Sequence, residues 1–181
     1  GATEWAQQTL SPYPKPWYAV GAGSRWLTKR WPPESFAQLL KRAQESRGGT
    51  ALFVGTPDEA EISAQVQKTL TGPSLDFVGK TSLAQLSALL KCADVMIAND
   101  TGPLHLAVGL GTPCVAPYTC TKVVKHGPYG QSGGVETSVP CKGSYIRQCD
   151  RLDCMKELTA EKLWPALQSV LETWPSRYPL L

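Results

Sequence analysis

The sequence predicts an α/β fold built on a parallel β-sheet with helices on both faces. Short apolar runs bounded by glycine alternate with helical patterns along most of the 181 residues. Such alternation is typical of parallel strands joined by crossover helices. A hydrophobic content of 42% without a dominant low-complexity stretch suits one domain with a substantial core.

The first half of the chain contains three predicted strands separated by two helical patterns. The apolar runs stop at glycines, and both helical patterns open on proline followed by acidic residues. In chain order the predicted elements are a strand at 17–20, a helix from Pro32-Pro33 to Gly48-Gly49, a strand at 51–54, a helix over 57–70 and a strand at 75–78.

The second half continues the alternation as far as residue 117, after which the pattern weakens. Pro165 should either kink the last helix or lie within its first two turns, where a lost N–H matters less. The predicted elements are a helix capped by Ser82, a strand at 94–98, a helix opening on Pro103, a strand at 112–116, a short strand at 135–139 and a helix capped by Thr159.

Ligands of open parallel sheets bind outside the carboxyl ends of the strands, so the loops that follow the strands indicate the site. The loop 99–105 reads NDTGPLH and leads into a helix, whose free N–H groups and positive dipole end favour an anion. The loop 21–30, GAGSRWLTKR, adds hydroxyls and three cationic side chains. Together these two loops suit a diphosphate.

Carboxylates on the same edge suggest that the ligand also carries a sugar. Asp100, and either Asp58 or Glu59, could accept hydrogen bonds from sugar hydroxyls. A nucleotide-sugar would satisfy all of these groups.

Each of these residues also has a plainer explanation. The glycines of GAGSRW do not form a dinucleotide GxGxxG motif and are compatible with a simple turn. Lys29 and Arg30 could be solvated, although a nearby helix N-terminus disfavours them without an anion. Asp100 could simply cap its helix, and His105 could be a core histidine bonded to a carbonyl.

Composition excludes two classes of partner. The net charge of +3 is spread along the chain, and no basic run is interleaved with aromatic residues, so we expect no nucleic-acid binding. No run approaches the roughly 18 apolar residues of a membrane span, and no signal peptide opens the chain. The sequence predicts a soluble, cytoplasmic domain.

The predicted domain occupies residues 17–175. Residues 1–16 start without Met and contain three prolines, which favours a linker or an expression scar. Residues 176–181 are expected to form a short tail.

The six cysteines fall into two groups. Cys92 and Cys114 lie in apolar contexts and are expected to be small buried residues. The other four fall in the irregular region, where their spacing does not match ordinary zinc sites; reduced thiols are favoured over a disulfide or a metal site. These four are Cys120, Cys141, Cys149 and Cys154.

Several blocks of the sequence occur in a familiar order: KRWPPESFAQLL, FVGTPDE, SLAQLSALLKCAD, NDTGPLHLAVGLGTP, GPYG and the stretch ending in Cys154-Met155. In this order they resemble the C-terminal half of family nine glycosyltransferases, the bacterial ADP-heptose:lipopolysaccharide heptosyltransferases. The resemblance covers residues 17–173. The chain departs from it in a slightly longer loop at 21–29 and in CKGS at 141–144, where relatives often have a CxxC-type pair.

The resemblance implies a GT-B architecture, in which this chain is the Rossmann-like donor-binding half and a missing N-terminal domain binds the acceptor. It implies the following binding residues: Gly23, Ser24, Lys29, Thr101 and Gly102 for the diphosphate, Asp58 or Glu59 for the ribose, backbone around Thr81 for the adenine, and Asp100 and His105 for the heptose and phosphates.

The implied reaction is inverting, metal-independent transfer of heptose from ADP-heptose to the lipopolysaccharide inner core. No cofactor is expected, and the general base would lie in the missing domain, so no catalytic base is assigned to this chain. The acceptor would bring the enzyme to the cytoplasmic face of the inner membrane. Two alternatives remain open, a GT-B-type sugar-nucleotide epimerase and a non-catalytic nucleotide-binding module.

Overall fold

The computed structural model describes residues 1–173 and contains a six-stranded sheet in the order β3-β2-β1-β4-β5-β6. All neighbouring strands pair in parallel, which confirms the predicted α/β class. The strands are β1 Trp17–Gly21, β2 Thr50–Phe53, β3 Ser74–Asp76, β4 Val95–Ala98, β5 Cys114–Tyr118 and β6 Gly134–Glu136.

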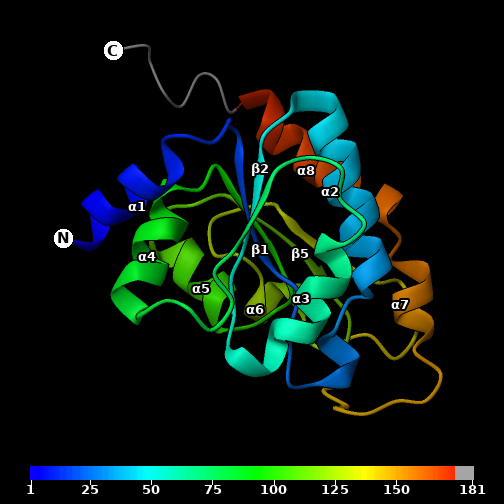
Figure 1. Ribbon diagram of the computed structural model, residues 1–181. Coiled ribbons are helices and arrows are strands. Elements are labelled where there is room, and N and C mark those ends of the chain that lie inside the picture. Colours follow the sequence, from blue (N-terminus) through cyan, green and yellow to red (C-terminus); the bar gives the residue numbers. More distant parts are fainter. Residues whose placement is uncertain (174–181) are drawn as a thin grey trace.

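Helices cover both faces of this sheet (Figure 1). The first face carries α1 Ala2–Leu10, α4 Leu83–Cys92 and α5 Gly102–Gly109. The second face carries α2 Pro33–Arg47, α3 Ala60–Gln67, α7 Asp153–Glu157 and α8 Ala160–Thr173. The short elements are η1 Leu27–Lys29, η2 Pro57–Glu59 and α6 Val123–His126.

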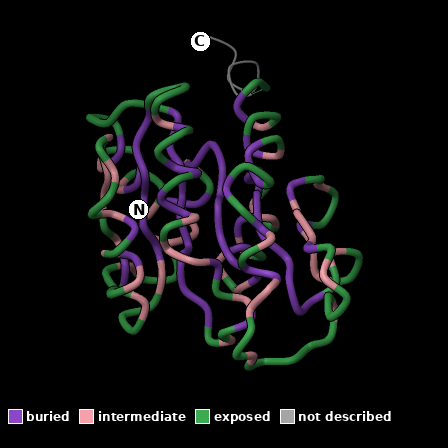
Figure 2. Tube along the Cα trace, turned by 90° about the vertical axis from the view of Figure 1, so that its right-hand side faces the viewer, coloured by how far each residue is buried: buried purple, intermediate pink, exposed green. Residues whose placement is uncertain are grey.

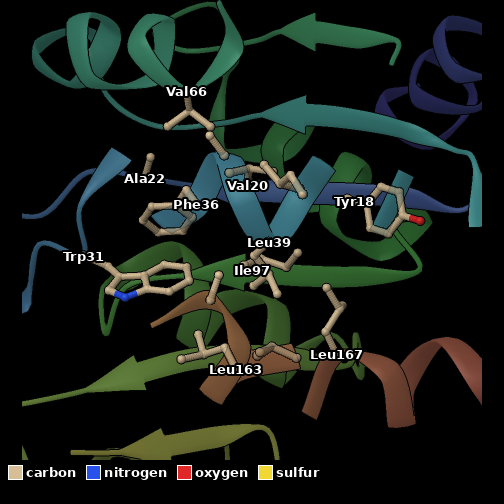
Figure 3. Close-up of a cluster of buried hydrophobic side chains, with 14 of the residues drawn as sticks. Tyr18, Val20, Ala22, Trp31, Phe36, Leu39, Val66, Ile97, Leu163 and Leu167 are labelled. Atoms are coloured by element: carbon tan, nitrogen blue, oxygen red, sulfur yellow. The ribbon is translucent and has the colours of Figure 1, made fainter. Parts of the chain in front are cut away.

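The central strands are buried on both sides, so their side chains feed two separate cores (Figure 2). Along β4, Val95 and Ile97 pack into one core and Met96 and Ala98 into the other, because successive strand residues point to opposite faces. Figure 3 shows Ile97 in the core on the second face, near side chains from α2 and α8. Continuous apolar runs are what a doubly covered parallel sheet requires.

Residues 1–16, expected as a linker, contain the helix α1. Its residues Ala6 and Leu10 are fully buried, and the helix packs against α4. Trp5 also meets Phe77 edge to ring, with centroids 6.1 Å apart. The prolines that suggested a linker all follow this helix, so they mark its end and the approach to β1.

Other boundaries differ by a few residues. The strand expected at 112–116 is β5, Cys114–Tyr118, because Thr112 still belongs to the turn and donates to Leu90 O at 2.7 Å. Helix α3 ends at Gln67, and the strands expected at 75–78 and 135–139 are the shorter β3 and β6.

Two predicted local features are confirmed. Ser82 caps α4, since its hydroxyl accepts from Gln85 N at 3.2 Å while Gln85 Oε1 accepts from Ser82 N at 2.9 Å. Pro165 lies within the first two turns of α8. The tail expected at 176–181 lies outside the described residues.

Candidate functional site

A large cavity lies at the carboxyl edge of the sheet, where the strand order changes direction. Strands β1 and β4 are neighbours, but the chain leaves them towards opposite faces, through η1 to α2 and directly to α5. Such a point opens a crevice between the two departing loops. The cavity here has a volume of about 1270 Å³. Nine of the ten binding residues expected from the sequence line it: Gly23, Ser24, Lys29, Asp58, Glu59, Thr81, Asp100, Thr101 and Gly102.

Lys29 and Asp100, on the two departing loops, form an ion pair. Lys29 Nζ lies 2.9 Å from Asp100 Oδ2 and 3.2 Å from Asp100 O. The ammonium also lies 4.4 Å from the ring centroid of Trp26, which lines the same cavity. An ammonium has three N–H donors, and two face Asp100, so one remains for a ligand.

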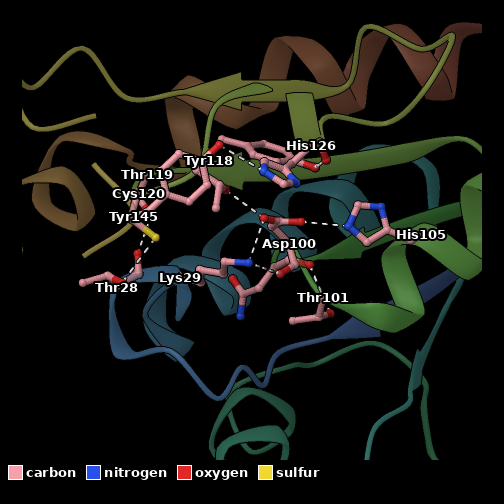
Figure 4. A network of polar contacts seen from close by, with 12 residues as sticks. Thr28, Lys29, Asp100, Thr101, His105, Tyr118, Thr119, Cys120, His126 and Tyr145 are labelled. Carbon is pink, nitrogen blue, oxygen red and sulfur yellow. Dashed lines mark hydrogen bonds and ion pairs between the residues drawn. The ribbon is translucent and has the colours of Figure 1, made fainter. Parts of the chain in front are cut away.

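Asp100 is held by three partners rather than acting as a helix cap. Thr121 Oγ1 donates to Oδ2 at 2.8 Å, and His105 Nε2 lies 2.9 Å from Oδ1 (Figure 4). Burial by itself would raise the pKa of this carboxyl, but the hydrogen bonds from Lys29, Thr121 and His105 and the charge of Lys29 hold the pKa below its ordinary value. Asp100 is therefore a fixed negative charge, and Thr101 takes the N-cap position of α5.

His105 is not the core histidine that local sequence allows. Its side chain is 49% exposed, and its ring bonds to the Asp100 carboxylate instead of a carbonyl. A carboxylate only accepts, so Nε2 carries the proton. His105 lies on the far side of Asp100 and lines a second cavity.

Asn99 joins the two loops, a role not expected from the sequence. Its side chain is fully buried; Oδ1 accepts from Trp31 N at 3.0 Å, and Nδ2 donates to Ala22 O and Gly23 O at 3.0 and 3.2 Å. Each of these backbone groups would otherwise be buried without a partner. The sequence feature that indicates this role is an Asn directly after a buried strand. An amide side chain carries both a donor and an acceptor, so it can bond to two loops at once.

The N-terminus of α5 lies at the same crevice. Thr101 and Gly102 line the cavity, and Pro103 follows in the first turn, where its missing N–H costs nothing. Thr101 Oγ1 bonds back to Asn99 O at 3.2 Å, which fixes the turn. An anion beside Lys29 would meet these amides and the positive end of the helix dipole.

Glu59 and Asp58 differ in their placement on the opposite wall. The Glu59 side chain lies against Gly23 and Gly55, and a Cβ added at Gly23 would be 2.1 Å from Glu59 Oε1. The other carboxylate oxygen, Glu59 Oε2, accepts from Thr56 N at 2.8 Å. Asp58 is exposed, and the hydrogen bond from Thr56 Oγ1 lowers the pKa of its carboxyl. Glu59 is thus the carboxylate set against the glycine loop.

An apolar wall completes the cavity. Leu83 is 71% exposed although it is a large aliphatic residue, and it lines the cavity with Leu86, Ile62 and Thr81. Gly79 N donates to Gly55 O at 2.9 Å, which holds the loops after β2 and β3 together. A flat apolar group could pack on this wall.

The irregular region after β5 supports the Lys29 loop from behind. Thr28 Oγ1 donates to Ile146 O at 2.6 Å and approaches Cys120 Sγ at 3.3 Å, while Thr119 Oγ1 donates to Thr28 O. The guanidinium carbon of Arg147 lies 4.7 Å from the ring centroid of Trp26. These contacts come from a segment without hydrophobic periodicity, so the sequence pattern did not predict which of its residues would meet the Lys29 loop.

The comparisons with known proteins agree on one family. The model of glycosyltransferase family 9 (heptosyltransferase) matches residues 2–153. Lipopolysaccharide heptosyltransferase 1 of Pseudomonas aeruginosa is 28% identical over 128 residues, which cover 70% of this chain and 36% of that protein. This chain therefore spans only part of the length of that relative.

Solved structures share the fold. The glycosyl transferase family 9 structure from Veillonella parvula matches with a TM-score of 0.82 at 24% identity, over 94% of this chain and 51% of that one. E. coli heptosyltransferase WaaC with ADP matches with a TM-score of 0.69 at 21% identity, over 91% of this chain and 48% of that one. The α/β sheet thus corresponds to half of a GT-B heptosyltransferase.

A more distant fold match raises the question of a metal. The dodecameric heptosyltransferase TibC of E. coli is iron-containing; its complex with ADP-D-beta-D-heptose matches with a TM-score of 0.68 at 15% identity, over 89% of this chain and 46% of that one. Within residues 1–173 of this chain, no three His, Cys, Asp or Glu side chains are arranged to hold a metal ion. All six cysteines are free thiols, with Cys141 exposed, Cys149 half-buried, and Cys120 and Cys154 buried. These residues do not fit a metal centre as they stand.

Proposed function

Because the chain belongs to glycosyltransferase family 9 (heptosyltransferase), we propose that it is the donor-binding half of a heptosyltransferase that transfers heptose from ADP-heptose to the lipopolysaccharide inner core. The six-stranded sheet and the helices on both of its faces, α1 included, would form this nucleotide-sugar domain. The chain spans about half of the matching family structures, so the acceptor site and the general base would belong to the other half. On its own this chain would bind the donor without transferring the sugar.

The observation that carries the proposal is the Lys29–Asp100 pair at the N-terminus of α5. Lys29, Thr101 and Gly102 line one crevice, where the ammonium and the N-terminus of α5 would give a diphosphate a charge partner and backbone donors. These groups are fixed before the ligand arrives. They would stabilise the charge that develops on the leaving ADP, and this needs no metal ligand in the chain.

The rest of the cavity suits the nucleoside and the sugar. Glu59, set against Gly23, is favoured over Asp58 as acceptor for the ribose hydroxyls, because Asp58 is turned to solvent. The apolar wall with Leu83 and the nearby Thr81 backbone would take the adenine. Asp100 would accept from a hydroxyl of the heptose. WaaC, one of the fold matches, was solved with ADP.

The acceptor suggests where the reaction takes place. The lipopolysaccharide core would be presented at the cytoplasmic face of the inner membrane, with the enzyme in peripheral contact through its other half. Among residues 1–173, no helix is long and apolar enough to cross a membrane.

Calorimetric titration of ADP into the 181-residue chain tests the proposal. The Lys29→Ala variant should bind ADP at least tenfold more weakly, because a charge-assisted hydrogen bond to phosphate is lost. Lys142→Ala is the matched control, since Lys142 also pairs with a carboxylate, Glu136 at 3.1 Å, but does not line the cavity. Equal affinities for wild type and Lys29→Ala, or no binding by the wild type, would refute the assigned site.

A further inference from the structure

Two cations contact the indole ring of Trp26, which lies in the loop between β1 and η1. The Lys29 ammonium lies 4.4 Å from the ring centroid, and the guanidinium carbon of Arg147 lies 4.7 Å from it. Trp26 is half-buried and, like Lys29, lines the large cavity at the carboxyl edge of the sheet. These distances suit cation–π interactions, in which the ring attracts a positive charge over its face. One indole therefore gathers two cations from segments that are far apart in the sequence.

The ring of Trp26 holds Lys29 in a different way from Asp100. The two Asp100 oxygens, at 2.9 and 3.2 Å from Nζ, use N–H donors of the ammonium, and the carboxylate also offsets its charge. An indole face attracts the ammonium but carries no negative charge. The long Lys29 side chain loses rotamer freedom when it is fixed, and it is only 17% exposed. The ring therefore restrains the ammonium and leaves its charge for a ligand.

Arg147 adds positive charge that no carboxylate offsets. Its side chain is exposed, and among residues 1–173 its guanidinium forms no ion pair. The segment that carries it is tied to the Lys29 loop, since Thr28 Oγ1 donates to Ile146 O at 2.6 Å. A diphosphate carries more than one negative charge, whereas the Lys29–Asp100 pair is neutral as a unit. A second cation beside the pair would supply the missing charge.

The two arginines of the loop 21–30 have different surroundings. Arg30 donates to Ser24 O from Nε at 3.2 Å and from Nη2 at 2.7 Å. Arg25 is exposed and interacts electrostatically with Asp58 on the opposite wall of the cavity. In the part of the chain that the structure describes, neither guanidinium contacts an aromatic ring. These two charges should therefore not depend on the indole.

We propose that Trp26 is a positioning residue for the donor diphosphate, and that its ring holds Lys29 and Arg147 close enough together to attract the same anion. The inference rests on the proposed function, because it takes the diphosphate of the donor as that anion. Trp26 acts through the two cations and needs no contact with the phosphates. The combined charge strengthens the attraction of an anion to this wall of the crevice, and salt screens part of that attraction.

Calorimetric titration of ADP into variants of the 181-residue chain tests the role of the ring. Trp26→Leu should bind ADP at least about fivefold more weakly, because both cations lose their cation–π contact. Trp26→Phe keeps an aromatic face and should recover most of the affinity. Trp5→Leu is the matched control, since Trp5 is also half-buried but packs against Phe77 and does not line the cavity. The control should bind ADP like the wild type.

Adenosine separates the positioning of charge from a collapse of the cavity, because it carries no phosphate. Its affinity, measured by ligand-observed saturation-transfer NMR, should be the same for the wild type and Trp26→Leu. Added salt should weaken ADP binding more steeply in the wild type than in Trp26→Leu, since the variant has less positive charge gathered at the site. A merely structural role of the ring would not change this salt dependence.

Arg147→Ala tests the second cation. It should weaken ADP binding and reduce its salt dependence, whereas Arg151→Ala should change neither, because Arg151 is exposed in the same segment but pairs with Asp153 at 2.6 Å. Equal ADP affinity of the wild type and Trp26→Leu, a parallel loss of adenosine binding, or no effect of Arg147→Ala would overturn the inference. Such results with intact, Lys29-dependent ADP binding would leave the proposed function standing, whereas no ADP binding by the wild type would remove both.

Discussion

His105 and Asp100 form a hydrogen bond of 2.9 Å that divides the carboxyl edge of the sheet into two cavities. One oxygen of the Asp100 carboxylate faces Lys29 of the larger cavity, and the other faces His105 of the second cavity. The buried carboxylate therefore orders a hydrogen-bond donor on each side of it, the Lys29 ammonium on one side and the His105 ring on the other. Asp100 therefore positions side chains of both cavities, whereas a helix cap would hold only the backbone of α5.

Asp100→Asn should destabilise the free chain by about 2 kcal/mol, because hydrogen bonds from a lysine and a histidine to a charged, buried group are weakened. His105→Ala should cost less than about 1 kcal/mol, since that side chain is half-exposed. Urea denaturation measures both. ADP affinity should not fall in Asp100→Asn, because the removed charge repels the diphosphate; an unchanged unfolding free energy would contradict the structural role.

Asn99→Ala should lower the free energy of unfolding by about 2 to 3 kcal/mol and also weaken ADP binding. The substitution leaves the Trp31 amide and the Ala22 and Gly23 carbonyls buried without their partner. Gln67→Ala is the control, because its amide makes one partly buried bond to Ser74 away from the cavity. Denaturant unfolding and calorimetry give the two values. A loss no larger than that of the control would show that Asn99 does not join the loops.

Gly23→Ala should weaken ADP binding by displacing Glu59. The added Cβ would lie 2.1 Å from Glu59 Oε1, and a flexible carboxylate is the group that can move away. We expect the ADP affinity to fall about fivefold, because a hydrogen bond to a charged group is weakened. The loss should be smaller in a Glu59→Ala background, where the added Cβ has no carboxylate to displace. A double-mutant cycle by calorimetry measures this coupling. Additive effects of the two substitutions would argue against contact between Glu59 and the ligand.

Glu157→Gln should lower the melting temperature at pH 6 and have no effect near pH 2. Hydrogen bonds from Lys162, Thr137 and Ser138 lower the pKa of Glu157 from 4.5 to about 2. A lowered pKa in the folded state means that the stabilisation is complete above pH 4.5 and disappears as the pH falls towards 2. Melting curves of both proteins between pH 2 and 7 check this; a constant difference across the range would exclude an ionic origin.

Local pattern was sufficient for most of the fold. The strands and the cap of α4 depend on residues that are close in sequence, so periodicity, glycines and capping residues reveal them, and the alternation of strands with helices predicts the parallel pairing. The helix α1 was missed because the three prolines after it dominated the local composition. The start of β5 differs because Thr112 belongs to the preceding turn, and β6 is shorter than the predicted strand.

The sequence by itself determined which loops meet at the carboxyl edge of the sheet, because parallel strands all end on the same side and the residues after each strand are known from the chain order. The chain order therefore places five residues at one edge of the sheet without knowledge of their contacts: Lys29, Asp58, Glu59, Thr81 and Asp100. Only the tertiary structure decided how they pair. The Lys29–Asp100 bond spans 71 residues, the Asn99 bridge to Ala22 spans 77, and His105 turns to a separate cavity. Such contacts depend on the packing of distant segments, and no local pattern encodes them.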